Sequence, residues 1–318
     1  MSEDEEINFD YVKQICDEIF AQMKKAVIGK IDVIEYILIS LLSGGHVLLE
    51  GVPGVAKTYM ANTFAKILNL EFKRIQFTPD LLPADIVGTY IYDQNKNEFR
   101  FRKGPIFANI ILADEINRAP PKTQSALLES MQEKQVTVEG TTYPLPEPFI
   151  VIATQNPIEL EGTYPLPEAQ LDRFMFRVFV DYPTGDEEVE ILELKNDEAK
   201  IELKAVTTAQ QIKQMQRMVN KVHIRREIME YIKDIVTKTR TDPQILLGAS
   251  PRASIVLLTG SKAYAAIKGR SFVIPDDVKK LAYASLNHRI ILKPEAELEG
   301  ITVDDVIKRI LEEASPPS

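Results

Sequence analysis

The hydrophobic positions of the chain fall into short runs, and these runs alternate with stretches of helical spacing. Five apolar runs are typical of buried parallel strands: 46–50, 72–77, 110–113, 149–153 and 176–180. Apolar residues recur with helical periodicity in four further segments: 9–25, 32–42, 58–68 and 121–134. This order predicts an α/β fold in which a parallel five-stranded sheet lies between helices.

Two insertions interrupt the alternation, and each predicts a β-hairpin. In the segment 90–101, aromatic and apolar residues flank a polar turn. In the segment 135–143, a strand-like piece is followed by Gly140 and a second such piece.

The pattern changes after residues 182–185, where helical periodicity continues without a further strong strand. We place a domain boundary there, because the length allows one large domain and a smaller companion, each with its own core. The expected organisation is a disordered acidic N-terminus (1–9), an α/β domain (10–184), a smaller all-helical domain (185–313) and a flexible tail (314–318).

Composition narrows the class of protein. Of the 318 residues, 45% are hydrophobic and 27% are charged, an ordinary globular balance. The net charge of −9 weakly disfavours nucleic-acid binding, since proteins that contact phosphates usually carry a basic surplus. A single cysteine, Cys16, excludes an intrachain disulfide, and the three histidines lack metal-site spacing. The lack of disulfides and metal clusters fits a reducing, cytoplasmic compartment. The longest apolar segment, 31–49, is interrupted by charged and polar residues, so we expect no membrane insertion.

A phosphate-binding loop is predicted after the first strand. The residues read Gly51-Val52-Pro53-Gly54-Val55-Ala56-Lys57-Thr58, which nearly fits the pattern G-x-x-x-x-G-K-[ST]. In such a loop the backbone N–H groups and the lysine bind phosphates, while the threonine hydroxyl coordinates Mg²⁺. Ala56 replaces the usual glycine, so we expect this position to need no positive φ. An ordinary Gly/Pro turn is the alternative, but the strand–loop–helix context favours a nucleotide.

Two carboxylates, Asp114 and Glu115, follow the buried run 110–113. Ligands of open α/β sheets bind at the carboxyl edge, where both side chains are expected. Asp114 would hold Mg²⁺ through water, because that ion keeps much of its shell, and Glu115 would polarise an attacking water as general base. An acidic pair after a strand is by itself usually a solvated loop, and the upstream Lys57 is what favours catalysis.

Two further residues have two interpretations each. Asn156 precedes a proline after the fourth apolar run, where it either opens a turn or positions the water against a γ-phosphate. Arg173 either pairs locally with Asp172 or serves as an arginine finger for a neighbouring subunit's nucleotide.

Arg252 is expected in the first turn of a helix, because Ser250 can cap it and Pro251 suits its first position. A cation there opposes the helix dipole at a cost of about 0.3–1 kcal/mol. The guanidinium is therefore either solvated or compensated by an anion, for which a γ-phosphate is a candidate.

The order of these elements resembles AAA+ proteins, and the detailed motifs resemble the MoxR family over residues 10–312. Five segments carry the resemblance: 51–58, 112–118, 153–157, 166–174 and 248–252. It implies a P-loop AAA+ domain followed by a helical lid. The residues it assigns are Lys57 and Thr58 to Walker A, Asp114 and Glu115 to Walker B, Asn156 to sensor 1, Arg173 to the finger and Arg252 to sensor 2.

The resemblance also implies ligands and partners. Val27-Ile28-Gly29 resembles the segment that lines the adenine pocket, and the two hairpins match insertions of the family. ATP and Mg²⁺ are the implied ligands. A homo-oligomeric ring, commonly a hexamer, and chaperone-like remodelling with partners that carry von Willebrand A domains are implied too.

Three functions fit to different degrees. The resemblance favours an ATPase that remodels, assembles or loads metal into a partner protein. A nucleic-acid motor is disfavoured by the net charge and by a hairpin, 135–143, whose only nearby cation is Lys134 at its end. A non-hydrolysing ATP-sensing scaffold would have no need of the complete set Glu115, Asn156, Arg173 and Arg252.

Overall fold

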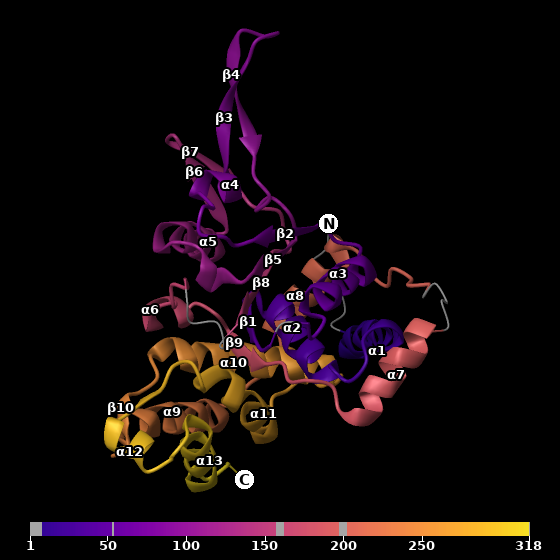
Figure 1. The fold of residues 1–318 in the computed structure, drawn as a ribbon. Coiled ribbons are helices and arrows are strands. Elements are labelled where there is room, and N and C mark those ends of the chain that lie inside the picture. The colour runs from indigo at the N-terminus through magenta and orange to yellow at the C-terminus, as the bar shows by residue number, and fades with distance from the viewer. Residues whose placement is uncertain (1–7, 53, 157–161, 197–201, 318) are drawn as a thin grey trace.

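A parallel five-stranded sheet forms the centre of the molecule. The computed structural model describes residues 8–52, 54–156, 162–196 and 202–317. The strands lie in the order β2-β5-β8-β1-β9, and every neighbouring pair is parallel (Figure 1). Their bounds are β1 (Val47–Glu50), β2 (Phe72–Gln76), β5 (Ile110–Asp114), β8 (Ile150–Gln155) and β9 (Phe176–Phe179). The predicted α/β fold is confirmed, since all five apolar runs enter this sheet.

Helices cover both faces of the sheet, which is why its strands are apolar on both sides. In β5, Ile110 and Leu112 pack into one layer, whereas Ile111 and Ala113 pack into the other. The first layer contains α1 (Phe9–Ala26), α2 (Ile31–Ser43) and α3 (Lys57–Leu68). The second contains α4 (Pro83–Val87), the 3-10 helix η1 (Ile116–Arg118) and α5 (Pro121–Glu133).

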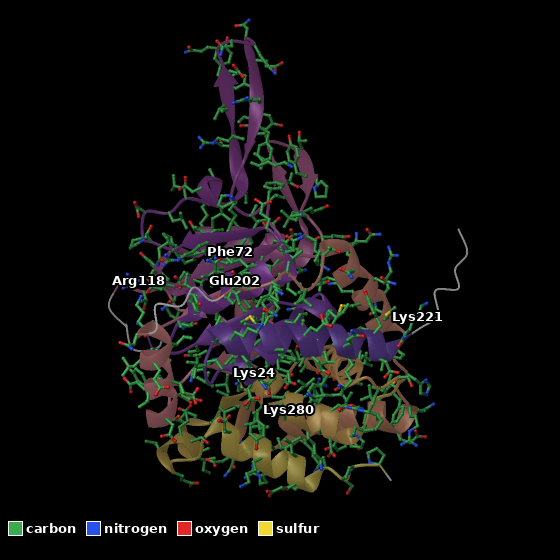
Figure 2. All side chains as sticks on the ribbon, turned by 90° about the vertical axis from the view of Figure 1, so that its right-hand side faces the viewer. Lys24, Phe72, Arg118, Glu202, Lys221 and Lys280 are labelled. Carbon is green, nitrogen blue, oxygen red and sulfur yellow. The ribbon has the colours of Figure 1, made fainter. Side chains whose placement is uncertain are left out.

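Both predicted hairpins are present and lie against each other. They are β3 (Gly88–Asp93) with β4 (Glu98–Lys103), and β6 (Gln135–Val138) with β7 (Thr141–Pro144). The Phe101 and Tyr143 rings stack with centroids 4.3 Å apart, and the Tyr90 and Tyr143 hydroxyls are 2.7 Å apart. The β3–β4 hairpin projects from the rest of the molecule in two views at right angles (Figures 1 and 2).

The C-terminal part is mainly helical. Its helices are α7 (Gly185–Asn196), α8 (Ala209–Asn220), α9 (Arg226–Thr241), α10 (Pro251–Ile267), α11 (Pro275–Leu286), α12 (Pro294–Leu298) and α13 (Val303–Glu313). One antiparallel pair, β10 (Ile245–Leu247) with β11 (Ile291–Leu292), corrects the expectation of helices alone. Strands of three and two residues are too short to produce an alternating pattern. None of the helices in the described ranges is both long and apolar enough to cross a membrane.

The two parts do not have separate cores, contrary to expectation. One buried cluster runs from Val12 in α1 through α2 into the lid helices as far as Ala314. A second cluster occupies the opposite face of the sheet, with α4 and α5. The cores therefore follow the faces of the sheet, because α2 is buried nearly all round and packs against α10 and α8 as well as the sheet.

The chain ends differ slightly from the expectation. Asn8 caps α1 by accepting from the Tyr11 N–H, so the ordered part begins before residue 10. Ala314, which the sequence places in the tail, is buried at the end of α13. Residues 1–7 and 318, expected to be disordered, lie outside the described residues.

Candidate active site

Strand register brings the acidic pair and its neighbours to one edge of the sheet. Gln76 is the register partner of Asp114, and Ala113 is the partner of Ala153. The Thr154 hydroxyl therefore reaches Asp114 and donates to its Oδ1 at 2.6 Å. The same hydroxyl accepts from the Glu115 N–H at 2.8 Å. Thr154 thus holds both carboxylate-bearing residues in place.

The predicted phosphate-binding loop joins β1 to α3 beside this edge. Lys57 Nζ donates to the Gly51 carbonyl at 2.6 Å, and the Thr58 hydroxyl lies 3.5 Å from Asp114 Oδ2. Burial lowers the pKa of Lys57, while the nearby carboxylates of Asp114, Glu115 and Glu50 act in the opposite direction. A Cβ on Gly51 would lie 2.3 Å from the Val180 carbonyl oxygen, so this approach of loop to chain requires glycine.

The expectation that Ala56 needs no positive φ is wrong. Its φ is 58° and its ψ 22°, in the left-handed region, where a non-glycine residue costs about 1 kcal/mol or more. Glu115 is also left-handed, with φ 56°. Strained backbone therefore occurs on both sides of the site, which is typical of functional loops. Pro53 of the predicted loop lies outside the described residues.

A cavity of about 370 Å³ lies between the loop and the sheet edge. Its lining confirms the proximity of several predicted residues: Gly54, Ala56, Lys57, Thr58, Asp114, Glu115 and Asn156. Asn156 is 6% exposed and follows β8 directly. Four segments far apart in sequence thus meet around one space, which is lined by a lysine, an arginine, three hydroxyl groups and two carboxylates.

The sequence interpretation missed two residues of β2 that contact the acidic pair. Arg74 Nε and Nη2 donate to Asp114 Oδ2 at 3.0 and 2.7 Å. Gln76 Nε2 donates to Glu115 Oε2 at 2.9 Å, and the Nε of Arg118 lies 3.4 Å from the same oxygen. Arg74 and Gln76 are two residues apart in β2, whose last residue lies beside Asp114 at the carboxyl edge of the sheet. Polar residues at alternate positions of a strand lie on one face, and this pattern was a signal that could have identified them.

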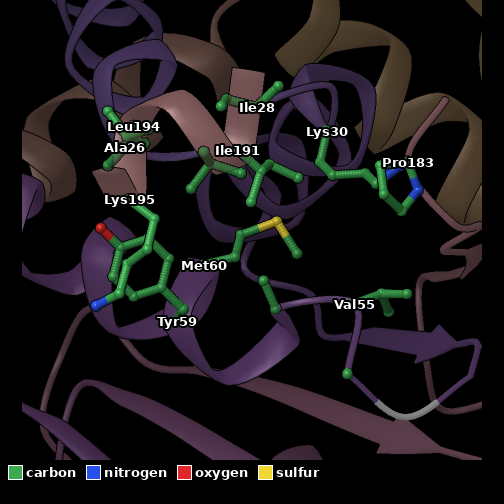
Figure 3. Close-up of a pocket in the computed structure, with 13 residues that line it drawn as sticks. Ala26, Ile28, Lys30, Val55, Tyr59, Met60, Pro183, Ile191, Leu194 and Lys195 are labelled. Atoms are coloured by element: carbon green, nitrogen blue, oxygen red, sulfur yellow. The ribbon is translucent and has the colours of Figure 1, made fainter. Parts of the chain in front are cut away.

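A second cavity of about 410 Å³ adjoins the first and is mainly apolar. Val27 and Ile28 line it, as predicted for an adenine pocket, together with Tyr59 and Met60 (Figure 3). Helix α7 adds further apolar side chains that the sequence did not indicate: Ile191 and Leu194. Gly29 is not in the lining. Its φ of 71° makes the turn there, and a Cβ would lie 2.1 Å from the Glu187 carboxylate at the start of α7.

The two arginines lie away from both cavities. Arg173 is half-buried just after α6 (Glu168–Leu171), and Arg252 is in the first turn of α10 with its N–H bonded to the Ser250 hydroxyl, as predicted. The local pair of Asp172 with Arg173 is not what the described contacts show. Asp172 instead accepts from Ser250, Arg252 and Arg289.

Comparisons with known proteins agree with the fold. A family model described as "ATPase family associated with various cellular activities (AAA)" matches residues 46–176, and one described as "AAA lid domain" matches residues 237–310. The chain is 50% identical over 296 residues to the uncharacterized protein YeaC of Bacillus subtilis, covering 93% of this chain and 92% of that protein.

Two further proteins are similar to this chain over most of its length. The chaperone MoxR1 of Mycobacterium tuberculosis is 44% identical over 305 residues, covering 93% of this chain and 81% of that protein. The crystal structure of a putative ATPase from Cytophaga hutchinsonii superposes with a TM-score of 0.91 at 46% identity, covering 98% of this chain and 97% of that one. By sequence and by fold, the chain belongs to the MoxR family of AAA ATPases.

Proposed function

We propose that this protein binds ATP with Mg²⁺ and hydrolyses it to ADP and phosphate. The observation that carries the proposal is the pair of adjoining cavities, which share Gly54, Ala56 and Tyr59. One cavity is apolar, as a base requires, and the other holds the lysine, hydroxyl and carboxylate groups that a triphosphate and its metal require. A nucleotide that spans both cavities would place its phosphates against Lys57 and the N-terminus of α3.

The residues divide the work of hydrolysis. Lys57 would bind the β- and γ-phosphates, and the residues from Gly54 to Thr58 would offer backbone N–H groups. Glu115 would take a proton from the attacking water, with Gln76 and Arg118 on its Oε2 to orient it. Asn156, buried at the end of β8, would donate toward that water or the γ-phosphate.

The residues present fit a magnesium ion. The Thr58 hydroxyl and Asp114 Oδ2 are 3.5 Å apart in the cavity of about 370 Å³, which we call the phosphate cavity. Both groups offer oxygen atoms, the ligands that Mg²⁺ prefers. Mg²⁺ in such sites takes one or two protein oxygens, with phosphate oxygens and water completing its shell. When bound, the ion would neutralise charge on the β- and γ-phosphates.

Two variants test the proposal. Lys57→Ala should abolish ATP binding, whereas Glu115→Gln should keep binding and lose turnover, because one residue contacts phosphates and the other the water. Nucleotide affinity and steady-state phosphate release are measured for both. Glu115→Gln that hydrolyses ATP at the wild-type rate would show that Glu115 is not the base, and a wild type without turnover would favour a sensing scaffold.

The larger role that we propose is chaperone-like work in a ring, in which Arg173 serves a neighbouring subunit. Two findings support it: MoxR1 is named a chaperone, and Arg173 is not among the described residues that line the two adjoining cavities. The client would be a protein that is remodelled, assembled or loaded with metal, with von Willebrand A domain proteins as the first class to test. Glu115→Gln held in ATP should retain the client, which mass spectrometry of the co-purified material identifies. DNA-stimulated turnover that falls with salt would instead support a nucleic-acid motor.

A further inference from the structure

Arg74 lines the phosphate cavity and forms an ion pair with Asp114 there. It lies on β2, and two of its nitrogens donate to one oxygen of Asp114, at 3.0 and 2.7 Å. The Asp114 side chain is 11% exposed and the Arg74 side chain 48% exposed. The carboxylate is thus largely fixed, while much of the arginine reaches into open space.

The oxygen that Arg74 holds is the one a metal ion would need. Asp114 Oδ1 already accepts from the Thr154 hydroxyl at 2.6 Å, so it faces the sheet. Oδ2 faces the Thr58 hydroxyl at 3.5 Å, across the place proposed for Mg²⁺. Arg74 and the water shell of a metal ion held by Asp114 would therefore compete for the same oxygen, and the two cations would repel each other.

The cavity also offers Arg74 a second partner once a nucleotide enters. Arg74 lines the same space as Gly54, Lys57 and Asn156. A guanidinium suits phosphate oxygens because its planar fork can donate two parallel hydrogen bonds. Lys57 remains close to the loop through its bond to the Gly51 carbonyl, whereas Arg74 approaches from the opposite wall on β2.

We propose that Arg74 is a second phosphate-binding cation, stored on Asp114 until the metal–nucleotide complex takes that carboxylate. The inference rests on the proposed function and adds a residue to it. Arg74 would then exchange a carboxylate for the γ-phosphate, so that its position reports whether the site contains a triphosphate.

The chain offers a matched control for Arg74 on the same strand. Lys73 is the preceding residue, so its side chain lies on the opposite face of β2. It is half exposed and lies 3.6 Å from Glu71, away from the cavity. Lys73→Gln and Arg74→Gln therefore remove the same charge from neighbouring positions, and only the second should alter the site.

The first experiment measures Mn²⁺ binding to nucleotide-free protein by electron paramagnetic resonance, with Mn²⁺ as the probe for Mg²⁺. Arg74→Gln should bind Mn²⁺ about tenfold more tightly than wild type, because Asp114 Oδ2 no longer has a counter-ion. Lys73→Gln should bind like wild type, and Arg74→Gln/Asp114→Asn should lose the gain. An unchanged affinity in Arg74→Gln would show that Arg74 does not compete for the metal ligand.

The second experiment measures the ratio of ATP to ADP affinity in EDTA, by displacement of a fluorescent nucleotide. Asp114→Asn removes the charge that holds Arg74 and leaves its hydrogen bond to the Gln76 side-chain oxygen, at 2.5 Å. The ratio should therefore rise about tenfold above that of Arg74→Gln/Asp114→Asn, since the difference isolates the contact with the γ-phosphate. Equal ratios in these two variants would overturn the transfer of Arg74 to phosphate.

The two proposals fail in different ways. If wild type and Lys73→Gln bind no nucleotide at all, the proposed ATPase function is wrong. If both bind ATP and ADP normally while Arg74→Gln changes neither the metal affinity nor the affinity ratio, only the role of Arg74 is wrong. Thermal unfolding of each variant without ligand shows whether the comparison is made between folded proteins.

Discussion

Arg289 Nε donates to Asp172 Oδ1 at 2.6 Å, and this contact fixes the lid to the segment that carries Arg173. The Arg289 side chain is 1% exposed and also donates to the carbonyls of Asp172, Phe174 and Met175 at 3.0, 2.6 and 3.3 Å. The second carboxylate oxygen of Asp172 lies 3.5 Å from Nη1 of Arg252, which is 41% exposed. The Asp172 carboxylate therefore pairs with both buried Arg289 and solvent-exposed Arg252.

Asp172→Asn should lower the free energy of unfolding by about 3 kcal/mol, because Arg289 would stay buried without its counter-charge. Urea denaturation without nucleotide measures this loss. If Asp172→Asn unfolds at the wild-type urea concentration, the carbonyl oxygens around Arg289 suffice to hold its charge, and the ion pair is not a structural link.

Arg252→Ala should cost less than about 1 kcal/mol, since its ion pair is long and open to solvent and its cation opposes the α10 dipole. Its effect should appear instead in ATP turnover and in nucleotide-dependent protection of the lid from proteolysis. Equal losses of stability in Arg252→Ala and Asp172→Asn would assign Arg252 to structure rather than to the nucleotide.

Arg173→Ala should bind ATP normally yet lose most hydrolysis, because an arginine finger acts on the neighbouring chain's nucleotide. In GTPases such a finger contributes about 10³–10⁵ in rate, an upper guide here. Lys57→Ala subunits keep Arg173 but lack a loop that binds ATP. Arg173→Ala subunits keep a working loop but lack the finger. An equal mixture should restore complete interfaces, about a quarter of the total in a head-to-tail ring.

A dilution series of wild type with each variant separates this complementation from a need for several intact sites in one ring. Size-exclusion chromatography confirms that each variant assembles. Wild-type turnover by assembled Arg173→Ala would exclude the role in trans.

His46 should make the fold sensitive to acid. Its Nε2 lies 3.0 Å from the Met131 carbonyl, and its Nδ1 accepts from the Val151 N–H. Burial lowers the pKa of His46 from 6.5 to about 4, so the unfolded chain binds more protons between these values. The contribution of neutral His46 to the free energy of unfolding is fully present above about pH 6.5. It falls by about 3 kcal/mol as the pH drops to about 4.

Buried His288, whose pKa is also lowered by burial, acts in the same direction. Urea denaturation at pH 7.5 and pH 5 should show a smaller difference for His46→Gln than for wild type. His223→Gln, at an exposed position, is the control and should retain the wild-type difference. An equal difference in all three proteins would contradict the assignment to His46.

Ala56→Gly should stabilise the protein by about 1 kcal/mol, since glycine occupies a left-handed backbone without a Cβ clash. Ala126→Gly, inside α5, is the opposite control and should cost about 1 kcal/mol. Thermal unfolding without nucleotide checks both. A destabilised Ala56→Gly would mean that the methyl group makes a contact in the loop worth more than the strain.

Much of the candidate site could be predicted because its residues lie in short contiguous segments of the sequence. A loop such as 51–58 can be recognised only because strand, glycine turn and helix follow each other directly, and the same holds for Asp114 and Glu115 at the end of a buried strand. The two hairpins were predictable for the same reason, since their strands and turns are contiguous. Each of these inferences uses interactions between residues less than about 20 positions apart.

Contacts between distant segments were decided by tertiary structure alone. Arg74 meets Asp114 because β2 and β5 pair in one register, and no pattern in either strand contains that register. Asp172 could be expected to pair with its neighbour Arg173, yet the packing of α10 and α11 brings it Arg252 and Arg289 instead. Ala56 takes a left-handed conformation against its own preference, because the turn that joins the loop to α3 outweighs a local cost of about 1 kcal/mol.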